Sequence, residues 1–206
     1  MEINLNAKII VCFEQPHILK QASLFHLTNQ FITDEQTVQY YINQHVHSPY
    51  SNNKLELALK MLSLSSTILS RQINHLNSFE QLLVKFVAML LSKKKMVYLD
   101  NYLINFDQYY QSKIVRLLKK LARQQSMTIY ISDVDYNLLY QIGDLFYYPN
   151  LGYLTKQMVL KNIDNINSIY HPDSIKFIKY INQKYNLNIN YQVEVKELLK
   201  SLYRKH

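Results

Sequence analysis

Apolar positions between Met96 and Ser132 follow two different periods. Two short runs rich in β-branched and aromatic residues, 96–101 and 127–132, flank a stretch from about Asp107 to Gln125 with apolar residues at every third or fourth position. The runs are typical of buried strands, and the stretch is typical of an amphipathic helix. Strands joined by such a crossover are parallel, so the pattern predicts a β-α-β unit. The residues expected at its ligand-binding carboxyl edge are Asp100, Asn101, Ser132 and Asp133.

The residues before this unit predict a strand followed by a helix. Residues 8–13 form a continuous apolar run of the kind found in buried parallel strands. Beyond Pro16, the residues Leu24, Leu27 and Phe31 fall at helical spacing, which predicts a helix from about Lys20 to Gln30. Strand, turn and helix in this order match the layout of a phosphate-binding P-loop.

Aligned on the P-loop pattern G-x-x-x-x-G-K-[ST], this turn keeps only the lysine, at Lys20. Glu14 and Leu19 replace the glycines, and Gln21 replaces the magnesium-binding hydroxyl. A nest of backbone amides around a phosphate needs backbone without Cβ atoms, so these replacements remove it. Lys20 and Asp100 are the expected remnant of a nucleotide site, and an ordinary strand–helix junction is the alternative interpretation.

Three helices are expected in the middle of the chain. The first extends from about Glu35 to Gln44 and is capped by Thr33 or Asp34, and the second from about Lys54 to Ile73. A capping box formed by Ser78 and Gln81 predicts the third, which extends to about Ser92. This third helix is apolar nearly all round, which indicates that it is buried.

The pattern of the last third of the chain predicts two strands, followed by a polar linker and two helices. A strand after Asp144, a turn over 149–152 and a second strand to about Leu160 are expected, with Gly152 supplying a positive φ. A polar linker follows Lys161, then a helix with Pro172 at its first position and a final helix over 192–204. We therefore expect an α/β domain over 1–160, with a helical insert at about 34–75, and a two-helix extension over 161–206. The predicted fold is P-loop-like, a mostly parallel sheet flanked by helices.

Composition narrows the class of protein. The chain has 206 residues, 48% of them hydrophobic, which suits one globular domain with an appendage. The sequence has no apolar run of membrane-spanning length and no secretion signal at its start. The one cysteine, Cys12, excludes an internal disulfide, and a cytoplasmic location is expected.

Positive charge is concentrated in one part of the chain. The net charge is +8, and nine Lys or Arg against two Asp lie between Lys85 and Arg123. A local excess of positive charge that no acidic residue neutralises suits binding to the phosphate backbone of a nucleic acid. Such contacts do not recognise the base sequence. A solvated helix face is the alternative. The expected DNA-binding residues are Lys93, Lys94, Lys95, Lys113, Arg116, Lys119, Lys120 and Arg123.

The order of these elements resembles the second half of an ABC-type ATPase domain. Residues 76–81 stand where the signature motif would be, and 96–101 resemble a Walker B strand. Phe106 and Asp107 resemble the D-loop, and Asp133 takes the place of the switch histidine. Asn101 follows Asp100 where a catalytic glutamate would stand, and an amide cannot act as a general base. The resemblance implies an ABC-type fold, and these departures predict no catalytic residues, no enzymatic activity and no bound ATP.

Residues 9–20, and the run 91–95 that leads into Met96, also resemble the small DNA-end-binding family of type II-A CRISPR systems. Its members keep an ABC- or SMC-type domain without a working nucleotide site. This resemblance implies a homotetrameric ring around double-stranded DNA, a role in spacer acquisition, calcium as a cofactor whose ligands we do not place, and an integrase complex and effector nuclease as partners. The alternative is a degenerate, catalytically inactive nucleotide-binding subunit of an ABC transporter, paired with an active subunit.

Overall fold

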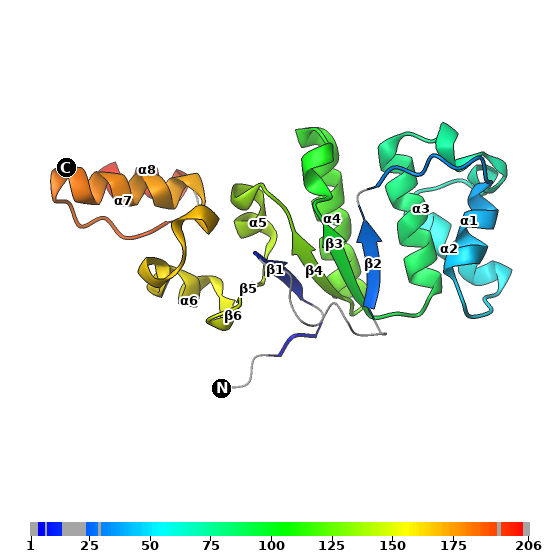
Figure 1. Cartoon of the computed structure of the whole chain (residues 1–206), viewed down its shortest axis with the longest axis horizontal. Helices are drawn as coiled ribbons and strands as arrows, with labels where there is room; N and C mark the ends of the chain where they lie inside the picture. The colour runs from blue at the N-terminus through cyan, green and yellow to red at the C-terminus, as the bar shows by residue number, and fades with distance from the viewer. Residues whose placement is uncertain (1–3, 7, 14–23, 29, 193–194, 204–206) are drawn as a thin grey trace.

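A six-stranded sheet forms the middle of the molecule (Figure 1). The computed structural model describes residues 4–6, 8–13, 24–28, 30–192 and 195–203. In sheet order the strands are β2 (Leu24–Thr28), β3 (Met96–Asp100), β4 (Thr128–Ser132), β1 (Ile9–Cys12), β5 (Leu145–Tyr148) and β6 (Gly152–Thr155). Every neighbouring pair is parallel except β5 and β6. The predicted fold class, a mostly parallel α/β sheet flanked by helices, is confirmed.

Helices extend the molecule beyond both edges of the sheet. In chain order they are α1 (Val38–His45), α2 (Asn52–Met61), α3 (Ser78–Leu91), α4 (Gln108–Gln124), α5 (Tyr136–Ile142), α6 (Lys156–Lys161), α7 (Asp173–Tyr185) and α8 (Val195–Tyr203). Figure 1 shows α1, α2 and α3 beyond the β2 edge, and α7 and α8 at the opposite end beyond β6.

The two faces of the sheet contribute to different apolar clusters. Side chains such as Val11, Leu99 and Ile131 belong to the large core that also includes residues of α3, α4 and α5. The side chains that alternate with these along the strands, such as Ile10 and Tyr130, lie on the other face and form a smaller cluster against which Leu5 packs. The alternation of side chains along each strand produces this division.

The central β-α-β unit is confirmed. β3 and β4 pair in parallel with Asp100 opposite Ser132. The Asp107 side chain accepts a hydrogen bond from Tyr110 N and so caps α4. Ile114, Leu118 and Leu121 are buried on the sheet-facing side of α4. Because these apolar residues face the sheet, the basic residues of α4 lie on the sides of the helix that face away from it.

The helix predicted from about Lys20 to Gln30 is wrong. Residues 24–28 form β2, an edge strand paired in parallel with β3 from Leu24 opposite Met96 to Thr28 opposite Asp100. The spacing of Leu24 and Leu27 fits a helix, but in so short a run it does not distinguish a helix from a strand. The pairing partner β3, about 70 residues away, decides the outcome.

The connection between β1 and β2, which contains the predicted P-loop-like turn, is short. Eleven residues separate Cys12 from Leu24, while β4 and β3 lie between the two strands in the sheet. The P-loop pattern alone takes about eight residues, and an average helix takes about eleven more. Lys20 itself lies outside the described residues.

Other element boundaries differ from the predicted ones. The capping box of α3 is formed by Asn77 and Glu80, one residue earlier than predicted. The predicted helix 54–73 ends at Met61, and two 3-10 turns follow it. Thr37 caps α1 in place of Thr33 or Asp34. After β6 the chain forms α6 rather than a strand to Leu160, and Pro172 is the N-cap of α7 rather than its first residue.

The C-terminal pair of helices has a small apolar cluster of its own. Ile178, Ile189 and Leu198 are buried together, with Ile181 and Tyr191 packed against them. Ile175 of α7 instead belongs to the large core, and Asn137 of α5 hydrogen-bonds the Asp173 carboxylate. Within the described ranges, none of the helices has the length and apolar content needed to cross a membrane.

Candidate functional site

The carboxyl ends of β3 and β4 bring Asp100, Asn101 and Ser132 together, as predicted. Ser132 Oγ donates a hydrogen bond to Asp100 Oδ1 at 2.9 Å, and Asn101 Nδ2 donates to the same oxygen at 3.1 Å. The Tyr98 hydroxyl lies 2.8 Å from Ser132 Oγ. Asn101 has a φ of 51°, a left-handed conformation that asparagine tolerates. Neutral side chains of the chain itself therefore already bind one oxygen of the Asp100 carboxylate.

Asp133 directly follows β4, and its carboxylate accepts hydrogen bonds from backbone N–H groups. It is 6% exposed. Its Oδ2 accepts from Leu103 N at 2.7 Å and Ile104 N at 3.3 Å, and its Oδ1 accepts from Val134 N at 2.9 Å and Asp135 N at 3.3 Å. Burial raises the pKa of this carboxyl group, although the four amide donors oppose the shift. Asp133 thus joins the loop after β3 to the loop after β4.

Sequence reasoning missed Lys85, a buried lysine on α3. Its Nζ donates to Thr28 O at 3.1 Å, Gln30 O at 2.6 Å and the Tyr102 hydroxyl at 3.1 Å, which accounts for its three N–H groups. Burial lowers the pKa of Lys85 to about 8. The sequence signal that could have indicated its burial is its position, because Lys85 is the one cation of a largely apolar helix. Lys85 fastens the end of β2 to α3.

Gln81 lies one helical turn before Lys85 on α3, and its side chain binds the backbone of Ile32, which follows β2. It is 2% exposed. Its Oε1 accepts from Ile32 N at 2.8 Å, and its Nε2 donates to Ile32 O at 3.0 Å and Ile73 O at 2.9 Å. The helix at the predicted signature position therefore uses its polar side chains to bind the backbone that follows β2.

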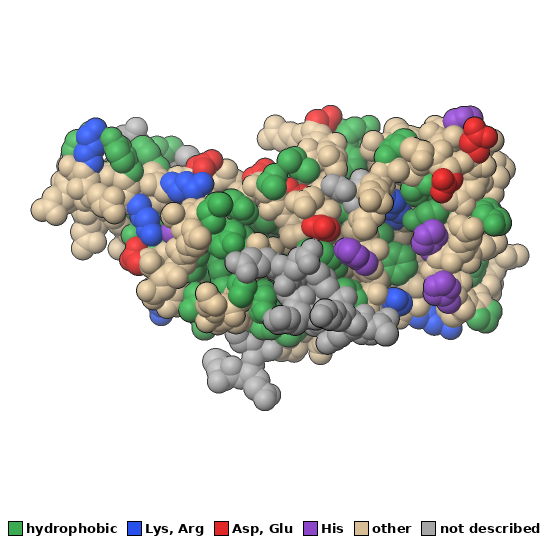
Figure 2. Space-filling model, in the orientation of Figure 1, with side chains coloured by type: hydrophobic (Ala, Val, Ile, Leu, Met, Phe, Trp, Pro, Cys, Tyr) green, Lys and Arg blue, Asp and Glu red, His purple; other side chains and the backbone are tan. Residues whose placement is uncertain are grey.

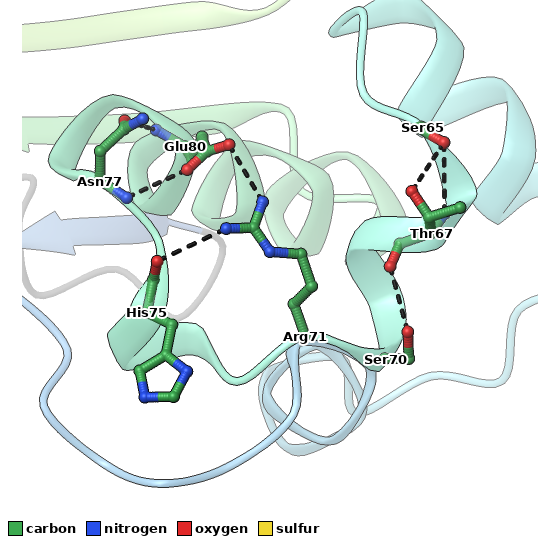
Figure 3. Close-up of polar contacts among 7 residues, drawn as sticks. All are labelled: Ser65, Thr67, Ser70, Arg71, His75, Asn77 and Glu80. Atoms are coloured by element: carbon green, nitrogen blue, oxygen red, sulfur yellow. Dashed lines mark hydrogen bonds and ion pairs between the residues drawn. The ribbon is translucent and has the colours of Figure 1, made fainter.

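The start of α3 is also fastened by polar contacts (Figure 3). The side chains of Asn77 and Glu80 form a reciprocal capping box with each other's backbone N–H. Arg71 forms an ion pair with Glu80 at 3.3 Å and also donates to His75 O. These contacts join the segment before α3 to the first turn of the helix.

The structure distributes the eight predicted DNA-binding residues over several surfaces. Lys93, Lys95 and Lys120 line a groove beside α2, and Arg116 and Lys119 line another between α4 and α5. None of the eight forms an ion pair with another described residue. In the view of Figure 2, Lys and Arg side chains lie toward the two ends of the molecule.

Three of the eight have distinct surroundings. Lys113 Nζ lies 4.2 Å from the centre of the Tyr109 ring, near Phe79 and Tyr110. Lys94 Nζ donates to Leu24 O at the edge of β2, which blunts an exposed strand edge. Arg123 is exposed in the last turn of α4. Whether any of them contacts DNA stays a prediction.

Whether the chain binds a magnesium–nucleotide complex stays a prediction, because the turn that would hold the phosphates, residues 14–21, lies outside the described residues. One oxygen of the Asp100 carboxylate is engaged by neutral donors, and the two glycines of the chain lie just before β5 and at the start of β6, two and three strands along the sheet from β4. Throughout the described ranges, no three His, Cys, Asp or Glu side chains gather into a metal-binding group. Calcium binding stays a prediction.

Comparisons with known proteins give matches only at the level of structure. No protein-family model and no curated protein sequence matches the chain. A chain of an inward-facing ABC transporter is 17% identical, with a TM-score of 0.62 and coverage of 77% of this chain and 76% of that one. The cbiO1 protein of Clostridium perfringens, part of the ABC transporter complex cbiONQ, is 12% identical, with a TM-score of 0.62 and coverage of 88% and 85%.

A third solved structure agrees with these two. It is an ATP-binding cassette of an ABC transporter in its ADP conformation, 13% identical with a TM-score of 0.59, and the match covers 80% of this chain and 86% of that one. Similarity at these identities establishes a shared fold and leaves the chemistry to be argued from the residues. The chain has the fold of an ATP-binding cassette.

Proposed function

We propose that this protein is a catalytically inactive, cassette-type subunit of an ABC transporter, which acts by contact with an active partner subunit. The observation that supports this most directly is the state of Asp100. The cassette-like sheet is retained, while the Asp100 carboxylate at its edge accepts from Ser132 and Asn101. This is an arrangement suited to holding a fold together.

The chemistry of the neighbouring positions points in the same direction. A hydrolysing cassette needs a group to orient or deprotonate water and charged groups around the phosphates. Asn101 follows Asp100 and offers an amide, and Asp133 has its carboxylate bound to four backbone amides. A subunit with these residues contributes surface and rigidity to an assembly rather than phosphoryl transfer.

The pure chain is expected to show no ATP hydrolysis above background in the presence of Mg²⁺. The reason is that general-base and phosphate-binding groups are missing together, and each is worth orders of magnitude in rate. A phosphate-release assay on the chain and on Asp100→Asn is the measurement, and both proteins are expected to give the same trace. Turnover that disappears in Asp100→Asn would contradict the proposal.

The partner is tested separately. The chain is expected to co-purify in detergent with an integral membrane protein and a second, active cassette. Purification of the tagged chain from its own cells, with the untagged strain as control, is the measurement. Recovery of the chain with neither component, under conditions that keep membrane complexes intact, would contradict a role in a transporter.

Sequence-independent binding to double-stranded DNA remains a second candidate, supported by the eight basic residues without ion pairs. It predicts retardation of a linear duplex that weakens at least about tenfold between 50 and 200 mM salt. Changing Lys113, Arg116 and Lys120 to glutamate is expected to abolish it, with the triple variant Lys161→Glu, Lys184→Glu and Lys196→Glu as the matched control. A duplex that is not retarded at low salt removes this candidate, and with it the proposed tetrameric ring and role in spacer acquisition.

A further inference from the structure

A groove at the amino-terminal edge of the sheet combines an apolar floor with a basic rim. It lies where the carboxyl ends of α2, α3 and α4 meet, and its volume is about 790 Å³. Leu57, Met61 and Leu90 are among its apolar residues, and Leu57 is 65% exposed. Its basic residues are Lys54, Lys60, Lys93, Lys95 and Lys120.

The five rim lysines are all exposed, and among the described residues no Asp or Glu lines the groove. Two of them bind carbonyl groups at helix ends: Lys120 Nζ donates to Met61 O at 3.2 Å, and Lys95 Nζ donates to Gln125 O at 3.0 Å. Each helix carboxyl end carries about half a negative charge. Three such ends offset less than half of the charge of five lysines, so the rim is strongly positive.

The floor is continuous along one side of α2. Lys54, Leu57 and Met61 are spaced by three and four residues, so they lie along one face of that helix. The face extends over eight residues, from Lys54 to Met61, which is about 10 Å. Buried Ala58 and Leu91 complete the wall beneath it. A helix of two to three turns has the length to cover this surface.

We propose that this groove binds an acidic amphipathic helix of a protein partner. An amphipathic helix places apolar side chains at i, i+3, i+4 and i+7 into a groove of this kind, where Leu57, Met61 and Leu90 meet them. Carboxylates beside that apolar stripe reach the rim lysines, whose stems lie along apolar surface while the amines stay in water. This inference does not depend on the transporter role.

The apolar floor favours this occupant over the other polyanions. A nucleic-acid backbone offers phosphates to the lysines and leaves Leu57 and Met61 without apolar contact. An anionic bilayer is broad and flat, whereas this site is a concavity between helices. A helix fills the concavity with apolar groups and satisfies the rim at the same time.

The test uses a fluorescent synthetic peptide of about four turns, with leucines at helical spacing and glutamates on both sides of the stripe. The full chain is expected to bind it with micromolar affinity. A scrambled peptide of the same composition, which has no apolar stripe, is expected to bind at least about tenfold more weakly. Fluorescence anisotropy measures both titrations.

Variants of the chain separate floor from rim. Leu57→Ser is expected to weaken binding about fivefold or more, while the same change at another exposed leucine far from the groove, Leu187→Ser, is expected to have no effect. Lys54→Gln with Lys60→Gln is expected to weaken binding and to reduce its salt dependence, and Lys161→Gln with Lys196→Gln is the control. All the changed side chains are exposed, so the fold is expected to persist.

Three results would overturn the proposal. One is equal binding of the designed and scrambled peptides, or of wild type and Leu57→Ser. Another is the absence of any peptide binding. The third is preferential binding of a short duplex, or of vesicles of phosphatidylcholine with phosphatidylglycerol, that depends on Lys54 and Lys60 and displaces the peptide.

Discussion

Replacing Asp133 with alanine is expected to lower the free energy of unfolding by about 4 kcal/mol. The carboxylate is buried and accepts four backbone hydrogen bonds, from Leu103, Ile104, Val134 and Asp135. The truncation removes the acceptor and leaves four donors, each of which costs on the order of 1 kcal/mol without a partner. Because those donors belong to the loops after β3 and β4, both loops are loosened at once.

The matched control is Asp107→Ala. Asp107 is an exposed N-cap whose carboxylate accepts one hydrogen bond, from Tyr110 N at 2.9 Å, so its loss is expected to cost about 1 kcal/mol. Urea unfolding followed by circular dichroism gives both values. Asp133→Asn, which keeps one acceptor oxygen, is expected to fall between them. Equal losses for Asp133→Ala and Asp107→Ala would contradict the structural role assigned to Asp133.

The parts of the fold that could be predicted are those with a long or strongly patterned signal. The unit from Met96 to Ser132 was recognisable because two β-branched runs flank seventeen residues of helix with a regular apolar stripe. Its carboxyl edge followed from strand direction alone, which is why Asp100, Asn101 and Ser132 were placed together correctly.

β2 could not be predicted, because its evidence lies outside its own residues. Leu24–Thr28 is five residues long, and two leucines three apart suit a helix as well as a strand. What makes it a strand is pairing with β3. The same limit applies to the capping box, where a one-residue shift from Ser78 and Gln81 to Asn77 and Glu80 leaves the sequence signal almost unchanged.

The candidate site was predictable in its position and only in part in its use. Sequence placed Asp133 at the edge, but not the four amides that occupy it, because those come from loops of irregular shape. Lys85 was counted as one of nine positive charges, yet it is buried and binds Thr28 O and Gln30 O. Charge counts do not distinguish a solvated lysine from one that fastens a strand.

The basic residues divide into those that bind other parts of the chain and those that remain on the surface. Once Lys85 and Lys94 are assigned to β2, and Lys113 to the aromatic rings beside it, the lysines left over are gathered mainly around the groove beside α2. Of the nine positive charges between Lys85 and Arg123, two therefore bind the edge strand β2, and three surround an apolar surface available to a partner.

The stability of the protein is expected to peak near pH 9 and then to fall steeply. Burial lowers the pKa of Lys85 to about 8 from 10.5. Between these values the unfolded chain binds more protons than the folded one, so stability rises with pH by about 1.4 kcal/mol at pH 9. Lys85→Met is expected to remove this rise, and exposed Lys93→Met is the control.

Above about pH 9 the buried tyrosines and Cys12 reverse the trend. Burial raises the pKa of Tyr41, Tyr98 and Tyr140 to about 12. It raises the pKa values of Tyr102, Tyr130 and Tyr148 further, and that of the Cys12 thiol to about 12. A group whose pKa is raised by folding stabilises the protein below its unfolded pKa, and this contribution is lost as pH rises toward the folded value.

Each buried tyrosine therefore lowers stability by about 1.4 kcal/mol at pH 11. Together with Cys12, and after the gain from Lys85, the net loss is on the order of 7 kcal/mol, which is comparable with the whole stability of a typical domain. Unfolding near pH 11 is the expected result, with the loss of the far-ultraviolet circular dichroism signal coinciding with a cooperative step in the tyrosinate absorbance of the six buried tyrosines. A helical signal that persists at pH 11 while tyrosinate absorbance reaches the value for all 18 tyrosines would show that the buried hydroxyls are accessible to solvent and would contradict the packing of the sheet described above.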